Sequence, residues 1–200
     1  MIPISIREAL IVCFVACVIG PLALPDTGVA GTLDAPNIPS QVRVGGVGIK
    51  GGIINMGIIN VNGYEHNPGP SVTFGVFFNI HLVGKFMVSP TVDLHNIHIY
   101  DTDEFLGDFS LGLKYMHYIP RSGIAVRPGV YFGLGHLGPW EVMTQSTNYL
   151  MIKASTEVLL FSRARYAWVI DVGFTYGKGG NSAYDISINP SLTVRVGFEY

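Results

Sequence analysis

Hydrophobic and polar residues alternate along most of the chain after about residue 42. Eight stretches have the length of a strand. Four alternate cleanly (72–82, 124–134, 166–176 and 192–200), three less cleanly (86–98, 108–119 and 148–161), and the first, about 42–60, is rich in glycine. Strict alternation is typical of β-strands with two unlike faces. The first stretch also changes phase, which predicts a β-bulge within it.

The two faces of these strands differ in a way that indicates which one points outward. The apolar faces of the four clean stretches carry no charge, whereas the other faces consist mainly of glycine and small residues. A wall that meets lipid must lack charge, while a soluble barrel such as a lipocalin would carry charged residues on its outer face. A soluble barrel with inverted faces and an apolar ligand cavity is the alternative. We therefore expect the apolar face outside and a paired network of charges inside, made of Asp93, Lys114, Arg127, Lys153, Glu157, Asp171, Arg195 and Glu199.

The connections between the stretches alternate between long and short. The long ones are 61–70, 101–107, 138–147 and 177–185, and the tight ones are 83–85, 120–123 and 162–165. Such an alternation fits eight antiparallel strands with outer loops, inner turns and both chain ends in the periplasm. A tilted strand needs about 9–11 residues to cross a bilayer. The expected fold is all-β, an eight-stranded antiparallel up-and-down transmembrane β-barrel.

The composition agrees with a membrane protein built from strands. Hydrophobic residues make up 48% of the 200 residues and charged residues only 13%, about half the usual share of roughly 25%. After residue 30, no apolar run reaches the roughly 18 residues of a membrane-spanning helix. A formal net charge of −2 gives no electrostatic reason to expect a nucleic-acid partner. Both cysteines, Cys13 and Cys17, precede residue 31, so the rest of the chain has no thiol for a disulfide or a metal site.

The N-terminal residues have the features of a signal peptide. Arg7 precedes an apolar stretch at 9–24, and Gly28-Val29-Ala30 would serve as a cleavage site after Ala30. An uncleaved anchor and lipidation at Cys17 are the alternatives. We expect a cleaved signal peptide at 1–30, a periplasmic lead-in at 31–41 and the outer-membrane barrel domain at 42–200.

The last strand carries the most specific signal in the sequence. Residues 191–200 alternate between apolar and polar, with Gly197 three residues from a final aromatic residue. With this strand, residues 42–200 resemble the bacterial eight-stranded outer-membrane barrels, the OmpA/OmpX-like porin-family β-barrel domain. The resemblance implies a monomeric barrel with a filled interior and mobile surface loops, surrounded by outer-membrane lipid and lipopolysaccharide. It also implies a signal that the barrel-assembly machinery reads, formed by Leu192, Val194, Val196, Gly197, Phe198 and Tyr200.

Few residues of the chain suggest chemistry. Residues 46–51 match the G-x-G-x-x-G motif, but this motif binds dinucleotides only between a strand and a helix, and a strand is expected to follow here. His95 and His98 are three apart, which places them on opposite faces of a strand. No histidine is followed two residues later by Ser or Thr, the spacing that would set a base beside a nucleophile on one strand. We therefore expect no catalytic, cofactor or metal site.

The expected function is structural in the envelope or binding of a surface ligand through the outer loops. Eight strands enclose a lumen that side chains can fill, so we expect no general pore; a small-solute channel is one alternative. Another alternative is a lipid A acyl hydrolase. Ser155 and Glu157 share one face of a strand, but that face is expected to point into the barrel. An acidic cluster in and directly after the second predicted loop consists of Asp101, Asp103, Glu104 and Asp108, and is interpreted as solvated rather than as a Ca²⁺ site.

Overall fold

A computed structural model describes residues 45–99, 102–120, 122–139, 143, 145–161 and 167–200. The expected signal peptide and lead-in lie outside these residues. None of the described residues forms a helix long and apolar enough to cross a membrane. The strands are β1 (Gly45–Asn55), β2 (Ile59–Val61), β3 (Tyr64–His66), β4 (Pro70–His81), β5 (Phe86–Ile99), β6 (Thr102–Tyr115), β7 (His117–Ile119), β8 (Ile124–Leu137), β9 (Thr147–Phe161), β10 (Ala167–Gly180) and β11 (Asp185–Glu199).

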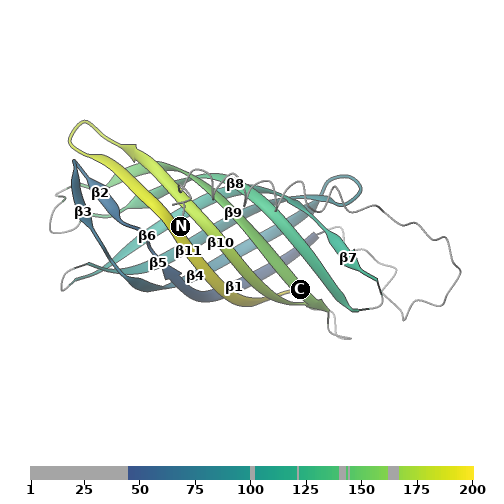
Figure 1. Cartoon of the computed structure of the whole chain (residues 1–200). Helices are drawn as coiled ribbons and strands as arrows, with labels where there is room; N and C mark the ends of the chain where they lie inside the picture. The colour runs from purple at the N-terminus through teal and green to yellow at the C-terminus, as the bar shows by residue number, and fades with distance from the viewer. Residues whose placement is uncertain (1–44, 100–101, 121, 140–142, 144, 162–166) are drawn as a thin grey trace, which may run out of the picture.

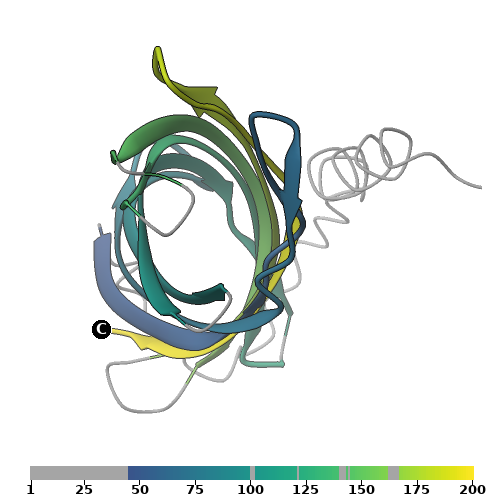
Figure 2. The ribbon, with the colours of Figure 1, turned by 90° about the vertical axis from the view of Figure 1, so that its left-hand side faces the viewer.

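Eight of these strands close into one antiparallel barrel (Figure 1). The order around the wall is β1-β4-β5-β6-β8-β9-β10-β11, and β11 pairs back with β1 to close the ring. β7 continues β6 along β8, while β2 and β3 continue the wall as a hairpin that pairs with β11. Figure 2, seen from the end that carries this hairpin, shows the strands surrounding a single interior. The predicted eight-stranded barrel is confirmed.

The change of phase predicted in the first stretch lies between β1 and β2, opposite Pro190 of β11, but the bulge predicted there is wrong. Asn55↔Leu192 and Ile59↔Ile188 keep one register, and a register shift lies instead between β10 and β11, at Thr175/Gly177. Proline has no N–H to donate to the ladder, and the pairing of β1 with β11 stops here and resumes with β2 in the same register. Two other contacts bridge the break: the Asn189 N–H donates to the Ile58 carbonyl (2.9 Å), and the Gly57 N–H donates to Ser191 Oγ (3.2 Å). The inward-facing positions thus change from even to odd numbers, with Ile54 and Met56 buried before the break and Ile59 and Val61 after it, while the wall stays closed.

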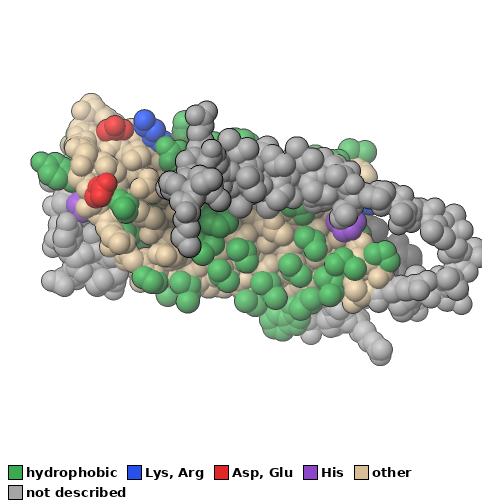
Figure 3. All heavy atoms as spheres, viewed as in Figure 1, with side chains coloured by type: hydrophobic (Ala, Val, Ile, Leu, Met, Phe, Trp, Pro, Cys, Tyr) green, Lys and Arg blue, Asp and Glu red, His purple; other side chains and the backbone are tan. Residues whose placement is uncertain are grey.

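The outer surface of the wall is apolar, and hydrophobic side chains are spread along the part of the wall that is visible in Figure 3. Around the wall, Val72 of β4 is 65% exposed, Leu111 of β6 52% and Leu150 of β9 69%. A protein in water would bury such a band, whereas a bilayer requires it. The alternative of a soluble barrel with inverted faces is therefore wrong.

Two of the predicted loops are mostly strand. β5 runs to Ile99 and β6 begins at Thr102, so the loop predicted at 101–107 is wrong. The loop predicted at 177–185 shortens to 181–184 because β10 and β11 extend into it. In both places the backbone pairing continues close to the turn, to Ile99↔Thr102 and to Gly180↔Asp185. The tight turns at 83–85 and 120–123 are confirmed in position, and the turn at 162–165 lies outside the described residues.

The loop predicted at 61–70 contains the hairpin of β2 and β3. Its turn is Asn62-Gly63, with φ of 52° and 88°. A two-residue turn with positive φ at both positions matches the right-handed twist of the flanking strands, and Asn-Gly is the pair that favours it. This dipeptide is therefore a hairpin signal, and a plain loop at these positions is the wrong prediction.

Replacing Leu111 by lysine tests the orientation of the wall. A lysine facing the hydrocarbon core is expected to lower the free energy of unfolding in phospholipid vesicles by about 2–4 kcal/mol. Tyr64→Lys is the control, because Tyr64 is 74% exposed in β3, outside the barrel wall, and its change should cost less than about 0.5 kcal/mol. Equilibrium urea titration measures both; equally small effects would contradict a wall that faces lipid.

Candidate functional site

A layer of charged side chains crosses the interior of the barrel. The alternation of the strands turns all eight residues of the predicted network inward, and the carboxylate of Glu199 retains slight exposure while the other seven are at most 2% exposed. A charge buried this deeply costs several kcal/mol unless it is paired and hydrogen-bonded. The geometry of the pairs therefore determines whether the interior is stable.

Glu157 of β9 is one centre of this layer. Its carboxylate accepts a hydrogen bond from Arg127 Nε (2.6 Å) and from Lys114 Nζ, which lies 3.0 Å from both oxygens. Arg127 uses a second nitrogen, Nη2, to donate to Glu199 (2.6 Å). Lys114 also donates to the amide oxygen of Asn79 (3.1 Å). One carboxylate thus connects cations from two neighbouring strands.

Arg195 of β11 is the second centre. Its guanidinium donates to Asp93 through Nη1 (2.5 Å) and to Asp171 through Nε (3.0 Å) and Nη2 (2.6 Å). Asp93 accepts a further hydrogen bond from Lys153 Nζ (2.8 Å). The fork of the arginine lets it bridge two carboxylates that come from different parts of the wall.

Lys50 of β1 joins the two centres, although it is absent from the predicted network. Its ammonium lies 3.1 Å from Glu157 and 2.9 Å from Asp171, and its side chain is fully buried. In the sequence Lys50 stands out only as part of the glycine motif. The signal that could have identified it is the alternation of β1, in which Val47, Ile49 and Ile53 take the outer face.

Two aromatic rings fill the space between the ammonium groups. Phe77 lies 5.0 Å from Lys50 Nζ and 4.9 Å from Lys114 Nζ, and Tyr131 lies 5.2 Å from Lys153 Nζ. Contacts at this range favour the cations by cation–π attraction. Each ring lies over the glycine with which its residue is paired on the neighbouring strand, Gly48 for Phe77 and Gly112 for Tyr131. A Cβ at Gly48 would overlap the Phe77 ring, as one at Gly112 would overlap Tyr131.

Asp108 belongs to the interior and not to a loop, which corrects the predicted acidic cluster. Its carboxylate accepts a hydrogen bond from the Tyr149 hydroxyl (2.5 Å) and lies 3.0 Å from His95 Nε2. Asp103 and Glu104 lie in β6, and Asp101 is outside the described residues. The sequence could not show this because His95 and Tyr149 come from β5 and β9.

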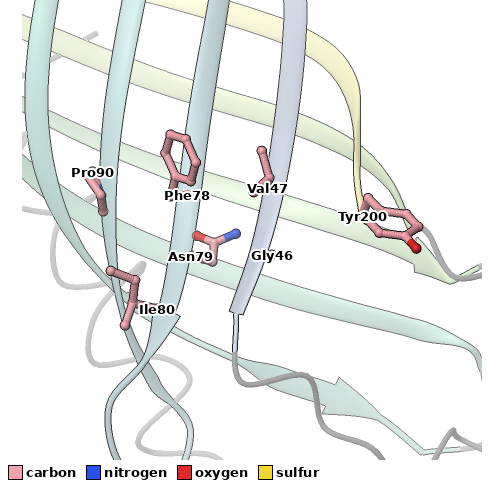
Figure 4. Close-up of a pocket in the computed structure, with 7 residues that line it drawn as sticks. All are labelled: Gly46, Val47, Phe78, Asn79, Ile80, Pro90 and Tyr200. Carbon is pink, nitrogen blue, oxygen red and sulfur yellow. The ribbon is translucent and has the colours of Figure 1, made fainter.

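Two grooves lie on the outer wall of the described part of the barrel. One, of about 570 Å³, is lined by Val47, Phe78, Ile80, Pro90 and Tyr200 near the end of the barrel with the tight turns (Figure 4). A second, of about 340 Å³, lies on β5, β6, β8 and β9. Within the described residues, no group of three His, Cys, Asp or Glu side chains is placed to hold a metal ion.

Comparison with known proteins identifies the architecture. No family model matches the sequence, and no curated protein matches it. Among solved structures, Neisserial surface protein A (NspA) superposes with a TM-score of 0.61 at 9% identity, over 78% of this chain and 96% of that one. The protein has the fold of an eight-stranded outer-membrane barrel. Ail of Yersinia pestis (TM-score 0.45, 10% identity, 79% and 100% coverage) and OprG of Pseudomonas aeruginosa (0.46, 13%, 79% and 97%) match less closely.

Lys50→Met tests the role of the lysine that joins the two centres. Removing one partner of a buried ion pair leaves its carboxylates undercompensated, so the free energy of unfolding in detergent is expected to fall by about 3–5 kcal/mol. Lys178→Met, at an exposed position of β10, should change it by less than about 0.5 kcal/mol. Arg127→Leu and Arg195→Leu should act in the same direction as Lys50→Met while leaving membrane insertion intact. Unchanged unfolding of all three interior variants would refute the network.

Proposed function

We propose that the protein is an integral outer-membrane protein that acts through its outer surface, in envelope structure or in binding, and is neither a pore nor an enzyme. The observation that carries this proposal is the filled interior. The charged layer occupies the middle of the barrel, its ion pairs cross the lumen from β1 to β9 and from β11 to β5, and aromatic rings pack beside its ammonium groups. Eight strands leave little room beyond this.

Apolar clusters on either side of the charged layer add to the case against a pore. The cluster toward the hairpins consists of Ile54, Met56, Ile59, Val61, Ile97, Leu106, Leu137, Met143, Tyr149, Met151, Ile186 and Ile188. A smaller cluster toward the tight turns consists of Met87, Met116, Ala125, Leu159 and Ala167. Ions need a continuous wetted path, and hydrophobic constrictions interrupt one.

The hairpins beyond the wall form an ordered surface. β2 and β11 pair from Ile59↔Ile188 to Val61↔Ile186, which joins the β2–β3 hairpin to the β10–β11 hairpin. Asn62 connects their tips, because its amide donates to the Ala183 carbonyl (3.0 Å) and its Oδ1 accepts from the Asp185 N–H (2.7 Å). Such a rigid surface favours recognition at low entropic cost. NspA, which shares the fold, is named as a surface protein.

An acyl hydrolase is not favoured by the placement of its candidate residues. Ser155 and Glu157 face the interior and are 2% and 0% exposed. Lipid substrates approach from the outer wall, so a nucleophile at Ser155 would not meet them.

Planar-bilayer recording tests the closed interior. The refolded protein is expected to show no stepwise conductance under conditions in which a general porin, inserted in parallel, conducts. Insertion is verified separately by the faster migration of the unboiled barrel on SDS gels. Regular single-channel steps from the folded protein would support the small-solute channel instead.

Epitope insertion tests the location and orientation. A tag between Asn62 and Gly63, or at Ser182, should be labelled on intact cells, because these positions lie at the hairpin tips. A tag at Gly84, in a tight turn, should be labelled only after the outer membrane is permeabilised. Labelling of the Gly84 tag on intact cells would reverse the proposed orientation, and labelling of none would argue against an outer-membrane location.

A further inference from the structure

The groove of about 340 Å³ on the outer wall combines an apolar floor with a polar end. Gly107, His136 and Asn148 stand in one row across β6, β8 and β9, since Gly107 pairs with His136 and His136 with Asn148. On the side toward the tight turns, the lining is apolar and exposed, with Phe109 and Leu134 more than half exposed. The groove is therefore amphipathic along the direction of the strands.

Gly107 leaves the floor of this groove open although the fold does not require glycine there. Its backbone is not in the left-handed region, and a Cβ would approach Leu94 Cδ2 only to 3.5 Å, an ordinary contact. In contrast, Gly48 and Gly112 are needed because large side chains fill the lumen against them. A side chain at position 107 would fit the fold and fill the groove.

The polar end of the groove can hold an anion. His136 Nδ1 and Asn148 Oδ1 are 2.8 Å apart, so the imidazole donates to the amide and the amide NH₂ stays available as a donor. Lys178 of β10 is exposed on the next strand, opposite Leu150, which neighbours Asn148 on the same face of β9. Donors and a cation at the edge of an apolar band match a phosphoryl group above acyl chains.

We propose that this groove binds a phosphoryl-bearing lipid of the outer leaflet. One acyl chain lies over Gly107 against Phe109 and Leu134, and the phosphoryl group is held by Asn148 and Lys178 beside His136. The proposal rests on the proposed function, because it requires the hairpin end of the barrel to face the outer leaflet. The groove volume falls within the roughly 300–1,000 Å³ that is usual for small-ligand sites. A second copy of this chain is a less suitable occupant, because a stable interface between proteins needs a much larger contact area than this groove offers.

Native mass spectrometry of the refolded full chain in detergent, with diphosphoryl lipid A as the probe, tests the site. The wild type is expected to retain one lipid A. Gly107→Leu, which fills the floor, and the double variant Asn148→Leu/Lys178→Met, which removes the phosphoryl contacts, should each retain about tenfold less. The wild type should retain diacylglycerol, which has acyl chains but no phosphoryl group, as poorly as the groove variants retain lipid A.

Matched controls separate this site from general lipid adhesion. Gly51→Leu and Asn55→Leu make the same kinds of change on the outer face of β1, away from the groove, and should retain lipid A as the wild type does. Equal loss in controls and groove variants, or no retention by folded wild type, would overturn the proposal. If the epitope tags still label intact cells, such a result would leave the proposed function standing.

Discussion

The barrel depends on pairing a layer of charges that lipid and apolar clusters separate from water. Each buried ion costs several kcal/mol unless a partner compensates it. The partners come from distant parts of the chain: Lys50 of β1 reaches Glu157 of β9 and Asp171 of β10. These contacts exist only when the first strand has closed against the last. Charge pairing in the interior therefore favours the closed ring over any open sheet that the same strands could form.

The same constraint shapes the wall. Arginine, lysine and aromatic side chains fit into an eight-stranded lumen only where neighbouring positions of the wall leave space for them. Glycines provide this space on the adjacent strands: Gly48, paired with Phe77, and Gly112, paired with Tyr131, would each clash with the ring if they carried a Cβ. Part of the glycine content of the sequence is thus a consequence of the filled interior, and Gly46 and Gly48 of the glycine motif in β1 belong to this packing.

Alternation was sufficient to predict the barrel and the direction of its faces, because lipid outside and paired charges inside impose opposite requirements on successive residues. Two interior residues were nevertheless missed. Lys50 lies in the glycine-rich first stretch, where the alternation is less clear, although Val47, Ile49 and Ile53 on the outer face could have placed it inside. Asp108 was assigned to a loop because its partner Tyr149 is 41 residues away in the chain and β6 begins earlier than predicted. Loop lengths were overestimated because strands continue beyond the bilayer on internal apolar packing. The assembly signal at 192–200 stays a prediction, although Phe198 and its outward neighbours do lie on the exposed face.

A filled interior also restricts where a function can lie. Every cation of the charged layer has a partner across the lumen, so a change made there to bind a ligand would first cost stability. A substitution on the outer wall or in the hairpins leaves no charge of this layer without its partner. Gly107 illustrates the difference: unlike Gly48, it is not fixed by packing, and a larger residue would fit. A glycine that packing does not require keeps the groove open beside donors at the edge of an apolar band, which fits an occupant in the groove better than it fits a need of the fold.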